Sequence, residues 1–186
     1  MLKKSIFLVL LSLSILFQGC GEKGEKAEDL NALVSSNEFV LTSTDNKQYI
    51  IKKETTGFTL EGAQGKVIIF DIFATWCPPC QASASHLTSL QKKYKDDLVV
   101  IGVTIEDTIT NQELRDFKTK YNAQYTIVNS DQNRRLVNEI ATALKLGNRF
   151  PIPIMALYKD GEFITHYIGE VQEEFVESDI KRALGK

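Results

Sequence analysis

A run of apolar residues at positions 67–73 (VIIFDIF) is followed after two residues by the sequence WCPPC at 76–80. An apolar run of this length is typical of a strand that is buried on both faces of a sheet. After the second cysteine, apolar side chains recur at helical spacing at Leu87, Leu90 and Tyr94, which predicts an amphipathic helix. The chain therefore passes directly from a buried strand into a helix, and this restricts it to a layered α/β fold.

The two cysteines lie at the junction between the predicted strand and the predicted helix. A C-x-x-C sequence in that setting is typical of a redox pair. Cys77 would lie at the helix N-terminus, where free backbone N–H groups and the helix dipole stabilise a thiolate, which is the attacking species. Cys80 would lie one turn inside. Pro78 and Pro79 fit the first helical positions because the N–H groups that they lack have no partner there.

Two other interpretations of the cysteine pair remain open. A structural disulfide that closes a ring of four residues would contribute only about 2 kcal/mol on the loop-entropy formula, before strain is subtracted. A zinc site needs two further ligands, and the two histidines, His86 and His166, stand at spacings that no usual zinc module shows. We assign His86 to the first helix and His166 to a C-terminal hairpin, and we expect no metal and no other cofactor.

Asp71 and Pro153 are further candidates for the site. Asp71 stands inside the apolar run, six residues before Cys77. Burial would raise the pKa of its carboxyl group and make it a candidate proton acceptor for Cys80; alternatively, the side chain reaches solvent at the end of the sheet. Pro153 follows Ile152 at the start of a predicted strand, a position that tolerates proline, and the bond between them is a candidate for the cis form.

The remaining pattern predicts a mixed sheet covered by helices. Short β-branched segments at 39–60 predict a hairpin around Asp45-Asn46-Lys47. We expect Asp131 to cap one helix and Gly147 to end it. The other expected elements are strands at 98–104 and 125–128, a helix at 111–121, a hairpin formed by 154–158 and 163–168, and a final helix that carries Phe175, Val176, Ile180, Ala183 and Leu184.

The first 19 residues have the features of an export signal. Lys3 and Lys4 precede an apolar or small stretch at 5–17, which is shorter than the roughly 20 residues that a membrane-spanning helix needs. The stretch and the following Cys20 resemble a bacterial lipoprotein signal, so we interpret 1–19 as a signal peptide and Cys20 as the lipidated residue. A secreted protein that is cut nearby and keeps a free thiol, or an uncleaved anchor, remains an alternative.

Cleavage before Cys20 would leave 167 residues, the size of one ordinary domain. We expect residues 20–36 to form a solvated tether, because 21–29 (GEKGEKAED) combine charge and glycine without a large apolar side chain. Residues 37–186 would form the single domain. The segment after the signal carries 20 basic and 24 acidic residues, and this balance gives no indication of nucleic-acid binding.

The motifs described above resemble those of the thioredoxin superfamily, over nearly the whole chain after the signal. The sequences DIFATWCPPC at 71–80 and IPIMALYKDGEF at 152–163 carry the resemblance. The resemblance implies a thioredoxin-like, three-layer α/β/α fold with a mixed sheet, here with an N-terminal β-hairpin extension. It also implies site roles: Asp71 as the buried aspartate, Cys77 as the nucleophile, Cys80 as the resolving cysteine, and Trp76 with Ile152 and Pro153, the latter cis, as the surface that binds substrate peptide.

The extra segment at 106–128, the leading hairpin and the signal are similar to the TlpA/ResA-like branch of extracytoplasmic thiol:disulfide oxidoreductases. That resemblance implies reduction of protein disulfides on the periplasmic side of a membrane, with apocytochrome c among the substrates of the branch. It also implies a membrane electron donor of the DsbD/CcdA type. Two alternatives stay open: a thiol oxidase or isomerase that uses the same cysteines, and a non-catalytic binding module that has kept the fold.

Overall fold

The computed structural model describes residues 37–147 and 149–186, and a five-stranded mixed sheet forms their centre. The strand order is β6-β5-β4-β7-β8. Strands β4, β5 and β6 run parallel, whereas β7 is antiparallel to β4, and β8 is antiparallel to β7. The bounds are β4 Val67–Phe73, β5 Leu98–Thr104, β6 Thr126–Val128, β7 Ile154–Lys159 and β8 Glu162–Ile168.

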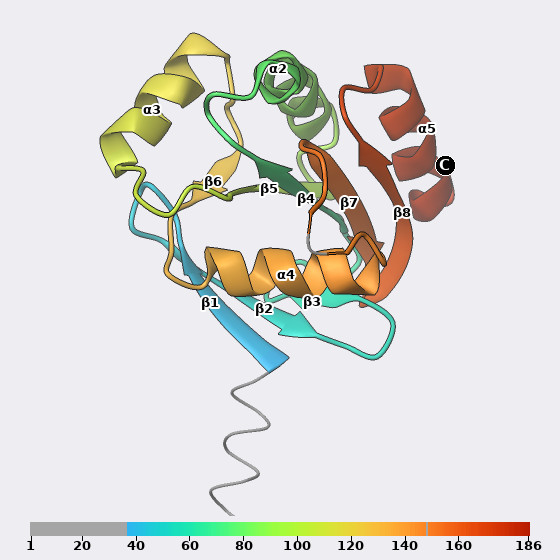
Figure 1. Cartoon of the computed structure of the whole chain (residues 1–186). Helices are drawn as coiled ribbons and strands as arrows, with labels where there is room; N and C mark the ends of the chain where they lie inside the picture. The colour runs from blue at the N-terminus through green and yellow to red at the C-terminus, as the bar shows by residue number, and fades with distance from the viewer. Residues whose placement is uncertain (1–36, 148) are drawn as a thin grey trace, which may run out of the picture. The chain divides into compact units, whose positions relative to one another are not determined.

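Four helices cover the two faces of this sheet within the described residues: α2 (Pro78–Lys93), α3 (Asn111–Lys120), α4 (Asn133–Ala143) and α5 (Glu173–Leu184). Helices α2, α3 and α5 lie on one face, and α4 lies on the other (Figure 1). This arrangement confirms the three-layer fold with a mixed sheet. It also gives two separate hydrophobic cores, one on each side of the sheet.

Strand β4 lies in the middle of the sheet and is buried along its whole length. Successive side chains of a strand point to opposite faces. Accordingly, Val67, Ile69 and Phe73 pack toward α2 and α5, while Ile68 and Phe70 pack on the α4 side. This double burial explains why the sequence of β4 is apolar at every position except one. The exception, Asp71, shares the face of the sheet that is covered by α2.

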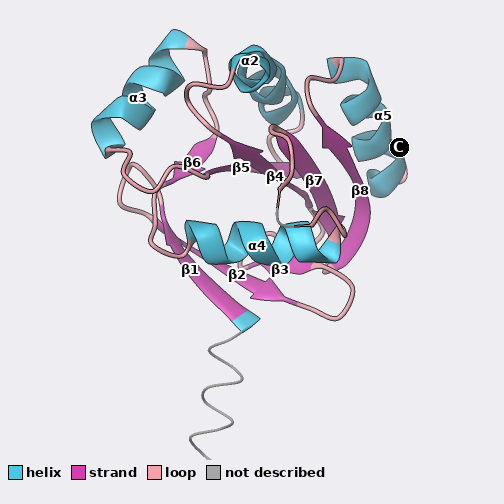
Figure 2. Cartoon of the chain, in the orientation of Figure 1, coloured by secondary structure: helices cyan, strands magenta, loops and turns pink. Residues whose placement is uncertain are grey.

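A second sheet of three antiparallel strands lies on the same side as α4 (Figure 2). It comprises β1 (Glu38–Thr42), β2 (Gln48–Lys53) and β3 (Phe58–Leu60). The predicted hairpin is present as β1 and β2, and Asn46 adopts the positive φ of 60° in its turn. Strand β3 extends this hairpin, and its Phe58 packs edge-on against Tyr158 of β7, with 5.3 Å between ring centroids.

The predicted ends of α4 were wrong. The residue before the helix is Gln132, not Asp131, and its side chain makes no capping hydrogen bond. At the other end, Lys145 takes the left-handed conformation with φ 58°. Its N–H bonds the carbonyl of Thr142, and the next N–H bonds that of Ala141, which is a closing motif of helix C-termini. The helix therefore ends before Gly147.

The predicted signal at 1–19, the tether at 20–36 and the lipidation site Cys20 lie outside the described residues. Among the residues that the structure describes, no helix is both long enough and apolar enough to cross a membrane.

Candidate redox site

Cys77 and Cys80 form a disulfide at the N-terminus of α2, with their Cα atoms 5.2 Å apart. Cys77 is the N-cap residue and has extended backbone angles, and the N–H of Cys80 donates to its Sγ at 3.3 Å. Pro78 and Pro79 occupy the first helical positions, as the sequence predicts. Because Pro78 and Pro79 lack N–H groups, the N–H of Cys80 is the first that the helix offers, and it lies where it stabilises negative charge on the Sγ of Cys77.

Solvent exposure does not distinguish the two cysteines in this oxidised state, because each is 3 % exposed. The difference between them is their position, since one caps the helix and the other lies within its first turn. The preceding residue, Trp76, is 66 % exposed and is one of the few large apolar side chains on the described surface. An exposed indole beside a disulfide offers apolar contact area to a second molecule.

The loop before the disulfide is held by two polar side chains. The carboxylate of Glu106 accepts hydrogen bonds from the backbone N–H of Thr75 at 2.7 Å and from its hydroxyl at 3.0 Å. The Nε2 of Gln81 donates to the Thr75 carbonyl at 2.7 Å. These bonds satisfy both the backbone N–H and the backbone carbonyl of Thr75. The residue directly before Trp76 is therefore held in place. Sequence reasoning did not identify Glu106 or Gln81.

The loop at Ile152 and Pro153 lies beside the disulfide. The peptide bond between these residues is cis, and the carbonyl oxygen of Ile152 is 3.7 Å from the Sγ of Cys77. The carbonyl of Pro153 accepts from the N–H of Gly169 at the end of β8, at 2.8 Å. The structure thus brings together Cys77 and Ile152, which are 75 residues apart in the chain.

Asp71, the predicted proton acceptor, is 2 % exposed, so its carboxyl group does not reach solvent at the end of the sheet. Its register partners are Gly102 on β5 and Met155 on β7. Burial raises the pKa of Asp71 to about 7, although a hydrogen bond from Tyr125 acts in the opposite direction. A carboxyl with this pKa exchanges its proton near neutral pH.

The two oxygens of Asp71 have different surroundings. Oδ2 accepts a hydrogen bond from the hydroxyl of Tyr125 at 2.9 Å, whereas Oδ1 is buried and has no hydrogen-bond partner. Sequence reasoning missed Tyr125 and placed it inside a strand, but β6 begins one residue later. The available signal was Gly102 in the middle of an apolar strand, because a glycine there often marks a close approach of another group.

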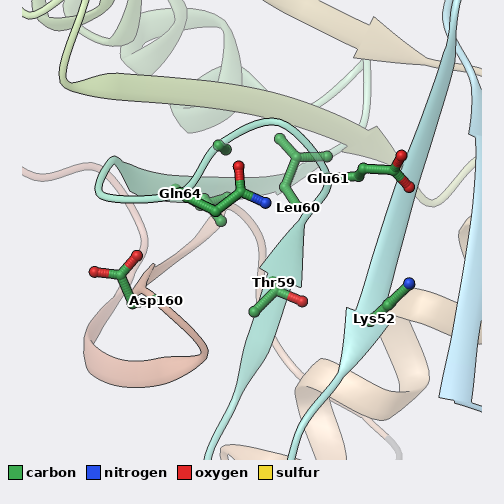
Figure 3. Close-up of a pocket in the computed structure, with 8 residues that line it drawn as sticks. Lys52, Thr59, Leu60, Glu61, Gln64 and Asp160 are labelled. Carbon is green, nitrogen blue, oxygen red and sulfur yellow. The ribbon is translucent and has the colours of Figure 1, made fainter.

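Some surface cavities of the described residues are not lined by the two cysteines. One, of about 320 Å³, is lined by residues of β2, β3 and the β7–β8 turn, among them Lys52, Thr59 and Asp160 (Figure 3). It contains none of the candidate residues. Another, of about 360 Å³, includes Phe150 in its lining and so borders the loop that leads to Pro153. No group of three His, Cys, Asp or Glu side chains suited to a metal ion occurs within residues 37–147 and 149–186.

Comparison with known proteins gives consistent matches. The family model described as Redoxin matches residues 23–184. The thiol-disulfide oxidoreductase ResA of Bacillus cereus is 25 % identical over 186 residues, which cover 98 % of this chain and 95 % of ResA.

Solved structures share the fold. A thiol:disulfide interchange protein DsbE from Chlorobium tepidum matches with a TM-score of 0.57 and 23 % identity, over 81 % of this chain and 95 % of the other. A secreted disulfide oxidoreductase of Mycobacterium tuberculosis, homologous to DsbE of E. coli, matches with a TM-score of 0.56 and 16 % identity. The match covers 80 % of this chain and 98 % of the other.

Proposed function

The chain belongs to the redoxin family and is a thiol:disulfide oxidoreductase of the ResA-like type, and from this premise we propose that it reduces disulfides of other proteins outside the cytoplasm. The observation that carries the proposal is the Cys77–Cys80 disulfide at the N-terminus of α2. It is supported by the buried Asp71, which shares its face of the sheet. In this proposal Cys77 is the nucleophile and Cys80 is the resolving thiol.

The first step is an attack on a substrate disulfide by the thiolate of Cys77. A bond forms between the Sγ of Cys77 and one substrate sulfur, and the substrate S–S bond breaks. The second substrate sulfur leaves as a thiolate and takes a proton from solvent. The backbone N–H of Cys80, 3.3 Å from the Sγ of Cys77, is a donor that stabilises the attacking thiolate.

The second step releases the substrate. Cys80 gives its proton to Asp71 and attacks the Sγ of Cys77, so that the Cys77–Cys80 disulfide forms and the bond to the substrate breaks. The first substrate sulfur leaves as a thiolate. Together the steps convert one substrate disulfide and an enzyme dithiol into a substrate dithiol and an enzyme disulfide. Asp71 suits the role of acceptor because burial raises the pKa of its carboxyl to about 7.

Substrate peptide would lie across Trp76 and the loop at Ile152 and Pro153. Trp76 supplies exposed apolar area, and the carbonyl of Ile152 lies next to the reacting sulfur. An extended peptide can pair with the backbone of such a loop, which is a common mode of peptide recognition. This geometry supports a protein or peptide substrate.

Membrane attachment and the partners belong to the same proposal. Lipid on Cys20 would hold the enzyme at the periplasmic side of a membrane. A membrane donor of the DsbD/CcdA type would return electrons to the Cys77–Cys80 disulfide after each turnover, and apocytochrome c would be one substrate. Support comes from the similarity to ResA and from the sequence before residue 37. Labelling cells with a fatty-acid analogue tests the anchor: the wild type becomes labelled, and Cys20→Ser stays unlabelled. A soluble, unlabelled wild type would disprove it.

A trapping experiment tests the proposed function. In Cys80→Ser the first step can occur but the second cannot, so substrate proteins accumulate on Cys77 as adducts that dithiothreitol releases. The matched control, Cys77→Ser, traps essentially nothing, because Cys80 lies inside the helix. Equal trapping by both variants would contradict the assigned roles. Partners that survive loss of both cysteines would indicate a binding module, and a trapped set dominated by proteins with C-x-x-C-H haem sites would indicate cytochrome c maturation.

A further inference from the structure

Tyr125 reaches Asp71 across an intervening strand. Tyr125 lies directly before β6, whereas Asp71 lies on β4. Strand β5 runs between β6 and β4. The hydroxyl of Tyr125 nevertheless donates to Oδ2 of Asp71 at 2.9 Å, and both side chains are buried. A buried hydrogen bond between side chains 54 residues apart in the chain requires the strand between them to leave space for the ring.

Gly102 provides that space. It is the register partner of Asp71 on β5. A Cβ atom at this position would lie 3.0 Å from Cε2 of Tyr125, 3.1 Å from Cγ1 of Ile127 and 3.3 Å from Cε1 of Phe73. All three separations are tighter than ordinary carbon contacts. Any residue larger than glycine would therefore press on the tyrosine ring at the point where it passes toward the carboxyl group.

The segment that carries Tyr125 is fixed from two sides. The ammonium group of Lys118, on α3, donates to the carbonyl of Tyr125 at 2.7 Å. Thr88, on α2, donates to the carbonyl of Asn122 at 2.5 Å and accepts from the N–H of Gln124 at 2.8 Å. The segment is thus tied through Thr88 to the same helix that carries the two cysteines.

The surroundings of Asp71 contain few titratable groups. Its register partners, Gly102 and Met155, do not titrate. Helix α2 contributes Cys77 and Cys80 to the core on this side of the sheet, and α3 and α5 contribute apolar side chains such as Phe117 and Ile180. Among the described residues, Tyr125 is the group whose hydrogen bond offsets the effect of burial on the pKa of Asp71.

We infer that Tyr125 is a positioning residue that occupies Oδ2 of Asp71 and leaves Oδ1 as the oxygen that takes the proton from Cys80. The inference rests on the proposed role of Asp71 in resolution. Oδ1 is the buried oxygen without a hydrogen-bond partner, so it has a lone pair free to accept. Tyr125 keeps its own proton throughout: the proton moves from the Sγ of Cys80 to Oδ1 while the new S–S bond forms and the substrate sulfur leaves.

The tyrosine hydroxyl also affects the pH dependence of resolution. A hydrogen bond to the ionised form of a carboxyl favours that form. Without the tyrosine hydroxyl, the pKa of Asp71 would rise further above its present value of about 7, and less of the carboxylate would be available near neutral pH. Resolution would then need a higher pH, whereas the first attack by Cys77 would be unaffected.

Ellman's reagent separates these two steps in one experiment. It is a symmetrical aromatic disulfide, so attack by Cys77 releases one coloured thiolate and resolution by Cys80 releases the second. The reduced protein, carrying Cys20→Ser so that two thiols remain, is mixed with the reagent in stopped flow from pH 5.5 to 9. For the wild type we expect a second phase whose rate rises with a midpoint near pH 7.

Tyr125→Phe keeps the ring and removes the hydroxyl. We expect its second phase to shift upward in midpoint by about one pH unit and to slow by roughly five- to tenfold at pH 7, with the first phase unchanged. Gly102→Ala displaces the ring and shifts the midpoint in the same direction. The matched control is Tyr121→Phe, a nearby tyrosine whose ring packs on Phe117, and it behaves as the wild type.

The outcomes separate this inference from the proposed function. If Asp71→Asn abolishes the pH dependence of the second phase but Tyr125→Phe matches the wild type, only the inference fails. If Asp71→Asn also changes nothing, the proposed role of Asp71 fails. A loss of rate in Tyr125→Phe that is equal at all pH values would show a merely structural role. In the oxidised protein, ¹³C NMR of the aspartate carboxyl groups measures the same midpoint shift without turnover, and an unshifted Asp71 titration would overturn the inference.

Discussion

Asp71 is an ionisable side chain inside a strand that is otherwise apolar and fully buried. Charging a carboxyl group in such a place costs free energy, because water can no longer solvate it and the one hydrogen bond from Tyr125 compensates only in part. Ionisation of Asp71 therefore lowers the free energy of unfolding, and this effect increases as the pH rises. A residue kept at such a cost is expected at sites where proton exchange is needed, rather than in a core that serves only packing.

This cost predicts that Asp71→Asn stabilises the oxidised protein at alkaline pH. The pKa of Asp71 is raised from 3.8 to about 7 on folding, so the folded state binds more protons than the unfolded state between these values. The stability that this group contributes is fully present below about pH 4 and is lost as pH rises through 7. At pH 8 we expect the variant to be more stable by about 2–4 kcal/mol.

Urea unfolding of both proteins at pH 4 and pH 8 tests this prediction, with the Cys77–Cys80 disulfide intact so that the thiols do not titrate. At pH 4 the two free energies of unfolding are expected to agree within about 1 kcal/mol. An equal difference at both pH values would mean that Asp71 has an ordinary pKa in the folded protein.

At the residue scale, the candidate site is only partly readable from the sequence. Cys77, Cys80 and Asp71 stand out because a reactive or charged side chain interrupts an apolar or helical pattern. Tyr125 does not stand out, since an aromatic residue beside a strand is common. Its contact with Asp71 depends on the register between β4 and β5 and on the missing side chain at Gly102. A contact between residues 54 apart in the chain produces no local sequence pattern from which it could be predicted.

At the scale of elements, the N-terminus of α2 distinguishes the two cysteines. Both are equally buried in the disulfide form, so accessibility alone would predict equal reactivity. However, Cys77 caps the helix, whereas Cys80 donates its N–H to the sulfur of Cys77. The helix dipole and the N–H of Cys80 therefore act mainly on the sulfur of Cys77, and the effect of the dipole declines within a turn.

We therefore expect iodoacetamide to alkylate Cys77 at least about tenfold faster than Cys80 in the reduced protein at pH 7. Peptide mapping by mass spectrometry after short labelling times assigns the modified residue and separates both from Cys20. The single variants Cys80→Ser and Cys77→Ser give the two rates separately. Faster labelling of Cys80 would reverse the assignment of nucleophile and resolving thiol.

Periodicity predicts the elements well but not all of their ends. The strands and helices from Val67 to Lys120 match expectation closely, because long apolar or amphipathic patterns determine their type. The end of α4 was missed, because the left-handed residue that closes the helix is Lys145, two residues before Gly147. Glycine is the usual residue there, but the backbone hydrogen bonds to Ala141 and Thr142 hold a lysine instead. Strand β3 was not predicted as a separate element, since the whole segment 39–60 was interpreted as one hairpin.

At the scale of the whole molecule, the direction of electron flow depends on which redox state the fold favours. Strong oxidants of this chemistry stabilise their reduced, thiolate form. Within residues 37–147 and 149–186, the polar groups that lie beside the Sγ of Cys77 are the backbone N–H of Cys80 and the carbonyl of Ile152, and no side-chain cation is among them. The acid on the same face of the sheet, Asp71, would add negative charge when ionised. The N–H of Cys80 is thus the thiolate-stabilising donor beside Cys77, and without a side-chain cation we expect the reduced form to be stabilised less than in a strong oxidant.

We therefore predict a reduction potential for the Cys77–Cys80 pair nearer to that of thioredoxin, about −270 mV, than to that of DsbA, about −120 mV. For a two-electron couple, about 30 mV corresponds to a tenfold change in the equilibrium constant, so the two reference values differ by roughly 10⁵-fold. Equilibration of the protein with known ratios of reduced and oxidised glutathione, followed by thiol trapping and mass measurement, determines the value, and Cys20→Ser removes the third thiol from the count. A potential above about −195 mV, the midpoint of that interval, would assign the enzyme to thiol oxidation or disulfide isomerisation. If the enzyme oxidises thiols, the substrates trapped on Cys77 would be proteins that acquire disulfides, and an oxidant rather than a membrane reductant would restore its Cys77–Cys80 disulfide after each turnover.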